Sequence, residues 1–247
     1  MLSEAPWIVF GAAMIANGVA MFLNDGVCRD SVYYCNLVGN WQKYDDIMLL
    51  SPSAWSATAV PPLYLWLIKT LSRFAGYDFL TAGRILNYFF GALTPVFFYR
   101  TLRISGVKAF LAFLSSLVLA CHPAMVDTCV IVTRDCLYRF LVVLAAFFIV
   151  KGVRQANQWA FCASGMVVAL ALLTRYEAAE FLLLPVLFFI PHFTKNVTWK
   201  LCGRQIALFF CSAAAAFWAA GCLMGFHAAY WAGFLHRYLV RAKDLLS

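Results

Sequence analysis

Long runs of apolar residues, separated by short polar segments, recur along the whole 247-residue chain. A membrane-spanning helix needs about 20 predominantly apolar residues to cross roughly 30 Å of hydrocarbon. Runs of this kind occur at residues 7–23, 85–99, 107–121, 137–150, 159–173, 178–191 and 205–225. Because the runs are continuous rather than alternating, they indicate helices and not the strands of a membrane barrel. The pattern predicts an all-α, polytopic membrane protein with about seven transmembrane helices.

A further apolar run, residues 61–76, is short for a membrane span and contains two cations. Lys69 and Arg73 are four residues apart and therefore share one face of a helix, with Trp and Tyr residues opposite. This combination is typical of a helix that lies in the membrane interface. We expect segment 24–84 to form one extracytoplasmic loop that contains such interfacial helices.

The distribution of charged residues predicts the orientation of the chain. If 61–76 does not cross, loops 100–108, 151–158 and 192–204 lie on the same side as the N-terminus. These loops contain no Asp or Glu and eight cations: Arg100, Arg103, Lys108, Lys151, Arg154, Lys195, Lys200 and Arg204. Cytoplasmic loops are enriched in Lys and Arg, so the N-terminus is predicted to be cytoplasmic and most carboxylates extracytoplasmic.

Composition excludes a water-soluble globule. The chain is 64% hydrophobic and 12% charged, with a mean hydropathy of +0.80, whereas soluble domains are about 45–50% apolar and about 25% charged. We attribute the net charge of +8 to the cations of the predicted cytoplasmic loops. We therefore expect no nucleic-acid partner. The sequence has no P-loop, no GxGxxG and no zinc spacing among its nine cysteines, so we expect no cofactor and no metal site.

Residues 1–247 are predicted to form one domain, with 226–247 as an amphipathic C-terminal tail.

Arginine and carboxylate residues occur close together three times on the predicted extracytoplasmic face. The pairs are Arg29 with Asp30, Arg134 with Asp135, and Arg175 with Glu177. Ionisable groups at the edge of membrane helices are costly unless they pair or face water. We therefore expect a polar cavity that opens toward the outer leaflet. In it, Asp30 is suited to act as a general base, and guanidinium groups are suited to hold phosphate.

Four segments in a fixed order resemble a known architecture. They are Arg29-Asp30-Ser31-Val32-Tyr33-Tyr34, then Pro61-Pro62-Leu63-Tyr64 followed by Gly83-Arg84, then His122-Pro123 running to Thr133-Arg134-Asp135, and Leu173-Thr174-Arg175-Tyr176-Glu177. Together they cover residues 20–190. The chain resembles the lipid-phosphate-sugar glycosyltransferases of GT-C architecture, which include protein O-mannosyltransferases and the aminoarabinose transferases of lipid A.

The resemblance implies a membrane enzyme that moves a sugar from a polyprenyl-phosphate donor to a protein, lipid or glycan acceptor on the extracytoplasmic side. It implies that Asp30 is the catalytic base of an inverting attack and that Asp135 is a second catalytic Asp. Asp25 is an alternative base if the loop is shifted. The residues implied for substrate binding are Arg29, Tyr34, Arg134, Arg175 and Glu177.

Plain structural roles explain some of these residues equally well. Asp135 is then an intramolecular partner of Arg134 or Arg139, and Arg175 and Glu177 form an ordinary pair at a helix end. At the level of function, the alternatives are a non-catalytic membrane subunit of the same fold and, less favoured, a transporter. A transporter is less favoured because the middles of the predicted spans contain essentially no ionisable residues. The expected location is a bacterial plasma membrane in preference to the endoplasmic reticulum.

Overall fold

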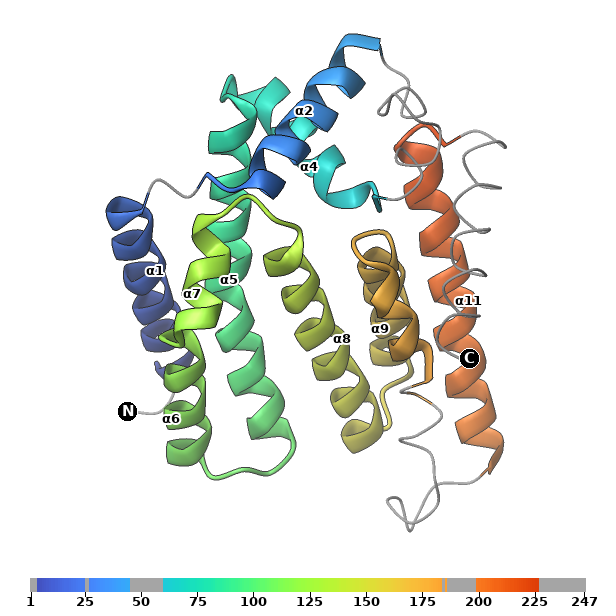
Figure 1. Ribbon diagram of the computed structural model, residues 1–247. Coiled ribbons are helices and arrows are strands. Elements are labelled where there is room, and N and C mark those ends of the chain that lie inside the picture. The colour runs from blue at the N-terminus through green and yellow to red at the C-terminus, as the bar shows by residue number, and fades with distance from the viewer. Residues whose placement is uncertain (1–3, 25–26, 45–59, 184, 186–198, 227–247) are drawn as a thin grey trace, which may run out of the picture.

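The computed structural model describes residues 4–24, 27–44, 60–183, 185 and 199–226. In this part of the chain the regular elements are all helices (Figure 1). Several sequence-based expectations fall outside it: the alternative base Asp25, the tail beyond residue 226, half of the predicted span 178–191, and residues 192–198 of the predicted third inner loop.

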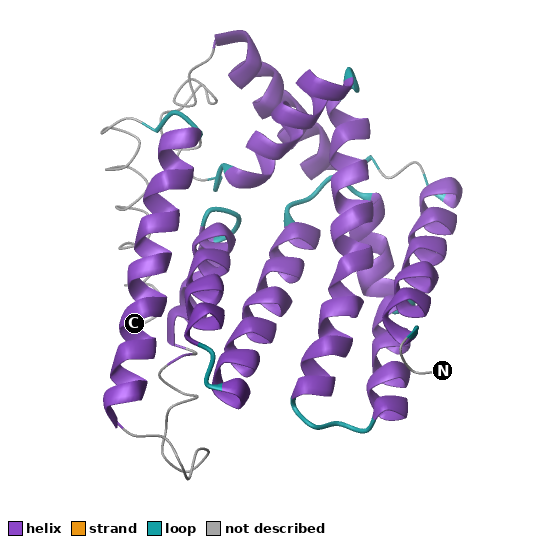
Figure 2. Cartoon of the chain, turned by 180° about the vertical axis from the view of Figure 1, so that it is seen from behind, coloured by secondary structure: helices purple, strands orange, loops and turns teal. Residues whose placement is uncertain are grey.

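Helices α1, α5, α8, α9 and α11 stand side by side in a row (Figures 1 and 2). Along the row, α1 packs on α5, α5 on α8, α8 on α9, and α9 on α11. The bounds are Ala5–Leu23 for α1, Phe79–Ile104 for α5, Asp135–Gln155 for α8, Gln158–Leu172 for α9 and Trp199–Leu223 for α11. Two shorter helices, α6 (Ala109–Ala120) and α7 (Pro123–Val130), cover α1 and α5.

The described helices contain three clear candidates for membrane spans. By length and apolar composition, α1, α8 and residues 203–223 are able to cross a bilayer. Helices α6 and α7 are a fourth candidate if the 46° bend between them lies within one span. Residues 178–183, the first part of the predicted span 178–191, do not form an α-helix but belong to a 3-10 helix, η2 (Tyr176–Leu183). The chain is thus a helical integral membrane protein, and the count of seven spans stays a prediction.

Helices α2 (Arg29–Tyr44) and α4 (Leu63–Ala75) lie obliquely over one end of the row (Figure 1). They bury Trp41, Tyr64 and Ile68 against it. The backbone N–H of Leu63 donates to the carbonyl oxygen of Leu173 at 2.9 Å, which fixes the start of α4 to the end of α9. The short run 61–76 is therefore a helix on the end of the bundle.

Helices α5 and α8 meet along a ladder of phenylalanines. The ring of Phe140 lies 5.1 Å from that of Phe90 and 5.8 Å from that of Phe97, and Phe97 is 5.5 Å from Phe147. Aromatic pairs at these separations add to the free energy of apolar burial. The ladder fixes the separation of the two helices.

The turns α5–α6 and α8–α9 lie together at the end opposite α2 and α4 (Figure 1). Arg154 of the second turn donates to the carbonyl oxygen of Ser105 in the first at 3.1 Å. Both turns belong to the cation-rich loops that the sequence predicts to be cytoplasmic. Their common position agrees with one cytoplasmic end for the bundle.

We expect the two ends of the bundle to differ in access to reagents outside the cell. In a cysteine-free background, Tyr77→Cys lies beside α4 and should react with a membrane-impermeant maleimide in sealed cells. Ser105→Cys lies at the opposite end and should react only after permeabilisation, which also serves as the labelling control. Free labelling of Ser105→Cys in sealed cells would contradict the predicted orientation.

Candidate functional site

The linker between α7 and α8 is held by side chains from two other helices. The backbone N–H of Val132 donates to Ser31 Oγ of α2 at 3.0 Å, and Asn87 Nδ2 of α5 donates to the carbonyl oxygen of Ile131 at 2.6 Å. Ser31 and Asn87 are both fully buried. These two bonds fix the linker, and with it the first turn of α8, where Arg134 and Asp135 lie.

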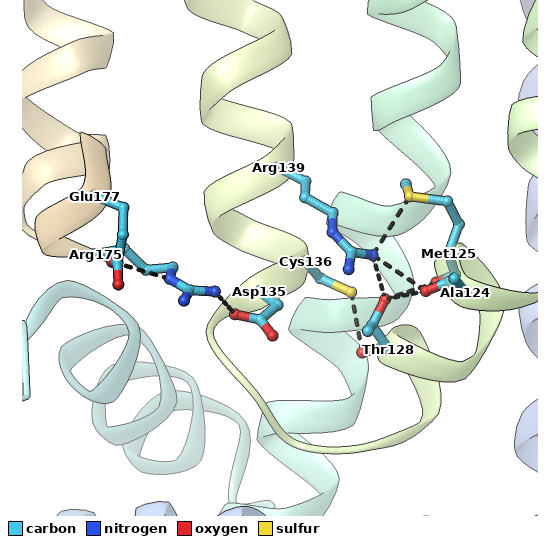
Figure 3. A network of polar contacts seen from close by, with 8 residues as sticks. All are labelled: Ala124, Met125, Thr128, Asp135, Cys136, Arg139, Arg175 and Glu177. Atoms are coloured by element: carbon cyan, nitrogen blue, oxygen red, sulfur yellow. Dashed lines mark hydrogen bonds and ion pairs between the residues drawn. The ribbon is translucent and has the colours of Figure 1, made fainter. Parts of the chain in front are cut away.

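Asp135, Arg175 and Glu177 form one ionic cluster at this end of the bundle (Figure 3). Arg175 donates from Nη1 to Asp135 Oδ1 at 2.5 Å and from Nε to Glu177 Oε2 at 3.3 Å. Burial alone would lower the pKa of Arg175, but the bonds and charges of the two carboxylates raise it. All three side chains are between 29% and 32% exposed, so the cluster is open to a ligand.

Arg175 and Glu177 can meet because Arg175 lies outside regular helix, between the end of α9 and the start of η2. Residues i and i+2 of an α-helix do not face each other. The chain leaves α9 at Leu172 and tightens into η2 from Tyr176, so this constraint does not apply. The same position brings the guanidinium of Arg175 within 5.3 Å of the Tyr138 ring centroid on α8.

Arg139, one of the two expected partners of Asp135, points toward α7 instead (Figure 3). It donates to Thr128 Oγ1 at 2.7 Å and to the carbonyl oxygen of Ala124 at 3.2 Å. The partner of Asp135 is Arg175, 40 residues later in the chain.

Two arginines present buried donors without acceptors. Within the described part of the chain, Arg134 Nη1 and both Nε and Nη2 of Arg84 are buried and have no hydrogen-bond partner. A buried polar group without a partner is costly, and an unpaired guanidinium is well suited to an anion. Arg84 was not among the site residues predicted from the sequence. The signal was its place in the Gly83-Arg84 motif, in the second turn of α5.

Tyr34 connects α2 with the cluster. Burial raises the pKa of its hydroxyl, the charge of Arg134 opposes this shift, and the charges of Asp30 and Asp135 add to it. Tyr34 therefore stays protonated and lies within the electrostatic reach of these three residues. Its ring packs edge-on against that of Tyr64, with centroids 6.0 Å apart.

Arg29 and Asp30 lie exposed in the first turn of α2. The structure thus brings Asp135, Arg175 and Glu177 into direct contact and places Arg134 next to Asp135 in the chain, whereas Asp30 lies one helical turn before Tyr34 on α2. Among the described residues, no group of three or more His, Cys, Asp or Glu side chains is arranged to hold a metal ion. The arrangement suits the binding of an anion beside an exposed carboxylate.

Comparison with known proteins gives a family and a fold. The family model described as dolichyl-phosphate-mannose-protein mannosyltransferase matches residues 59–218, which include Arg84, Arg134, Asp135, Arg175 and Glu177. A protein O-mannosyltransferase Pmt1–Pmt2 complex of S. cerevisiae, bound to the sugar donor, is similar in structure, with a TM-score of 0.66 and 16% sequence identity. The similarity covers 88% of this chain and 34% of the yeast chain, so the chain spans about a third of that protein's length. No curated protein sequence gives a significant match.

We expect Ser31→Ala to lower the free energy of unfolding by about 1–3 kcal/mol, because the buried N–H of Val132 loses its acceptor. Denaturant unfolding of the purified protein in detergent micelles measures the change. The control is Ser116→Ala, since Ser116 is equally buried and its hydroxyl donates within its own helix to Ala112. Equal losses in the two variants would contradict a special role for the bond between Ser31 and Val132.

Proposed function

Because the chain belongs to the dolichyl-phosphate-mannose-protein mannosyltransferase family, we propose that it is a membrane mannosyltransferase that uses a polyprenyl-phosphate sugar donor. The acceptor is a hydroxyl or amine of a protein, lipid or glycan. Transfer takes place at the bundle end beneath α2 and α4, on the extracytoplasmic side of the membrane. A bacterial plasma membrane stays the expected location. The most direct support is the buried, unpaired Nη1 of Arg134 beside the ion-paired Asp135.

The charges around the arginines assign them different tasks. Arg175 is already balanced by Asp135 and Glu177, and it therefore orders the site. Arg134 and Arg84 have buried donors without partners and are the better ligands for a phosphate group. We propose that these two arginines hold the phosphate of the donor.

The reaction replaces one bond at the anomeric carbon with another. The acceptor oxygen or nitrogen forms a bond to this carbon as the bond to the phosphate oxygen breaks, so the configuration is inverted. The departing polyprenyl phosphate takes the electron pair and gains a negative charge. Guanidinium donors placed where this charge develops stabilise the transition state, and no metal ion is needed for that task.

Asp30 takes the acceptor proton in this scheme. Its position in the first turn of α2 is open to an incoming acceptor, and the positive end of the helix dipole favours a carboxylate there. Tyr34, protonated and buried next to it in the same helix, is a hydrogen-bond donor for the sugar or for the base. Arg29 contacts the lipid headgroup region.

Asp135 is proposed as a positioning residue. Its carboxylate accepts a hydrogen bond from Arg175 and so holds Arg175 and Glu177 beside the start of α8. A carboxylate committed in this way is a poorer base than the exposed Asp30. Asp135 therefore shapes the site, whereas Asp30 moves the proton.

We expect Asp30→Asn to lower turnover by about 10²–10⁴-fold with little change in donor affinity, because the substitution keeps the shape and removes the base. The assay measures transfer from radiolabelled polyprenyl-phosphate mannose in membranes. Asp78→Asn is the matched control, since Asp78 is an exposed acid at the N-terminus of α5 whose capping role an Asn can retain. Loss of activity in Asp25→Asn but not in Asp30→Asn would move the base to Asp25. Absence of turnover in the wild type with any donor would favour a non-catalytic subunit of the same fold.

A second test compares an arginine that has an unpaired donor with one whose donors are engaged. Arg134→Gln removes an unpaired donor, and we expect kcat/KM for the donor to fall by about 10–100-fold. Arg134→Lys should restore only part of the activity, because an ammonium lacks the planar fork of a guanidinium. Arg139→Lys is the control, since Arg139 is engaged with α7. Equal effects of Arg134→Gln and Arg139→Lys on donor kinetics would contradict a phosphate contact at Arg134.

A further inference from the structure

A cavity lies between α2, α4 and the end of α11, and it shares no residue with the ionic cluster. Its volume is about 380 Å³, which is within the usual range for small-ligand sites. The residues that line it include Trp41 from α2, Trp66, Lys69, Arg73 and Phe74 from α4, and Leu223 and Met224 from the end of α11. We call it the α4 cavity.

The α4 cavity is positively charged. Lys69 and Arg73 are one helical turn apart and both line it, whereas none of its described lining residues is an acid. The ammonium of Lys69 lies 4.8 Å from the ring centroid of Trp41, a cation–π contact that holds the charge beside the cavity. These features favour a ligand with an anionic group.

The rim of the same cavity is apolar and exposed. Phe74 is 86% exposed and Leu223 is 76% exposed, and both line the cavity. Large exposed apolar side chains next to Trp, Lys and Arg are typical of the membrane interface, where acyl chains cover them and the cations reach headgroups. A ligand that satisfies both parts has a phosphate attached to hydrocarbon chains.

We propose that the α4 cavity is a binding site for an anionic phospholipid. Lys69 and Arg73 hold its phosphodiester, the two indole rings pack beside the headgroup, and the acyl chains run along Phe74 and Leu223. Because the cavity joins α2 and α4 to the end of α11, a bound lipid stabilises the assembly of these three helices. The site is independent of the proposed transferase activity.

The test uses the full chain, purified in a neutral detergent and titrated with dioleoyl-phosphatidylglycerol or, for comparison, dioleoyl-phosphatidylcholine. A ligand that binds the folded state raises the apparent Tm. We expect phosphatidylglycerol to raise Tm saturably by about 5–10 °C at 100 times its Kd, and phosphatidylcholine to have little effect. In the variant with Lys69→Gln and Arg73→Gln, the shift should be largely lost.

The control is Lys108→Gln, which removes an exposed cation at the opposite end of the bundle and should keep the full shift. If the double variant fails to fold, Arg73→Gln alone is used, and native mass spectrometry counts the phosphatidylglycerol molecules retained. One fewer molecule than in the wild type supports the proposal.

Three results would overturn the proposal. The first is an equal shift in the wild type and in the charge-removed variant. The second is an equal shift with phosphatidylglycerol and phosphatidylcholine. The third is protection by inorganic phosphate or by an acidic peptide, but not by phosphatidylglycerol, which would identify a soluble ligand instead of a lipid.

Discussion

The hydrogen bond from the N–H of Val132 to Ser31 Oγ joins parts of the chain that are 101 residues apart, and the candidate site depends on it. Ser31 lies next to Asp30 on α2, and Val132 lies two residues before Arg134. The bond therefore fixes the exposed carboxylate relative to the unpaired guanidinium. Since the N–H of Val132 is buried, an alternative arrangement of α2 would leave it without an acceptor at a cost of about 1–3 kcal/mol.

The sequence predicted the helical membrane fold, because the length of an apolar run is a local property. The GT-C resemblance is confirmed by the family match and by the fold. The partner of Asp135 could not be predicted, since the neighbours Arg134 and Arg139 gave the same local signal as Arg175. The 3-10 geometry of η2 was also missed, because an apolar run gives no sign of a tightened backbone. Arg84 was passed over because an isolated cation near a helix start is common at a membrane interface.

The two halves of the proposed mechanism have different kinds of support. The family match includes the phosphate-binding candidates Arg84 and Arg134 and begins at residue 59, after α2. The packing of α2 connects Asp30 to them through the hydrogen bond between Ser31 and the linker. The proposed base and the proposed phosphate ligands thus lie on different helices that meet at the linker between α7 and α8.

The phenylalanine ladder between α5 and α8 has a consequence for anion recognition. Arg84 and Arg134 each stand six residues before the two rings of the Phe90–Phe140 contact, roughly 9 Å along their helices. The ladder sets the distance between α5 and α8, so it also sets the distance between the guanidinium groups of Arg84 and Arg134. Under the proposed function, the size of the anion that these two arginines can hold then depends on the packing of the bundle's interior, so apolar substitutions that never touch the ligand can change it.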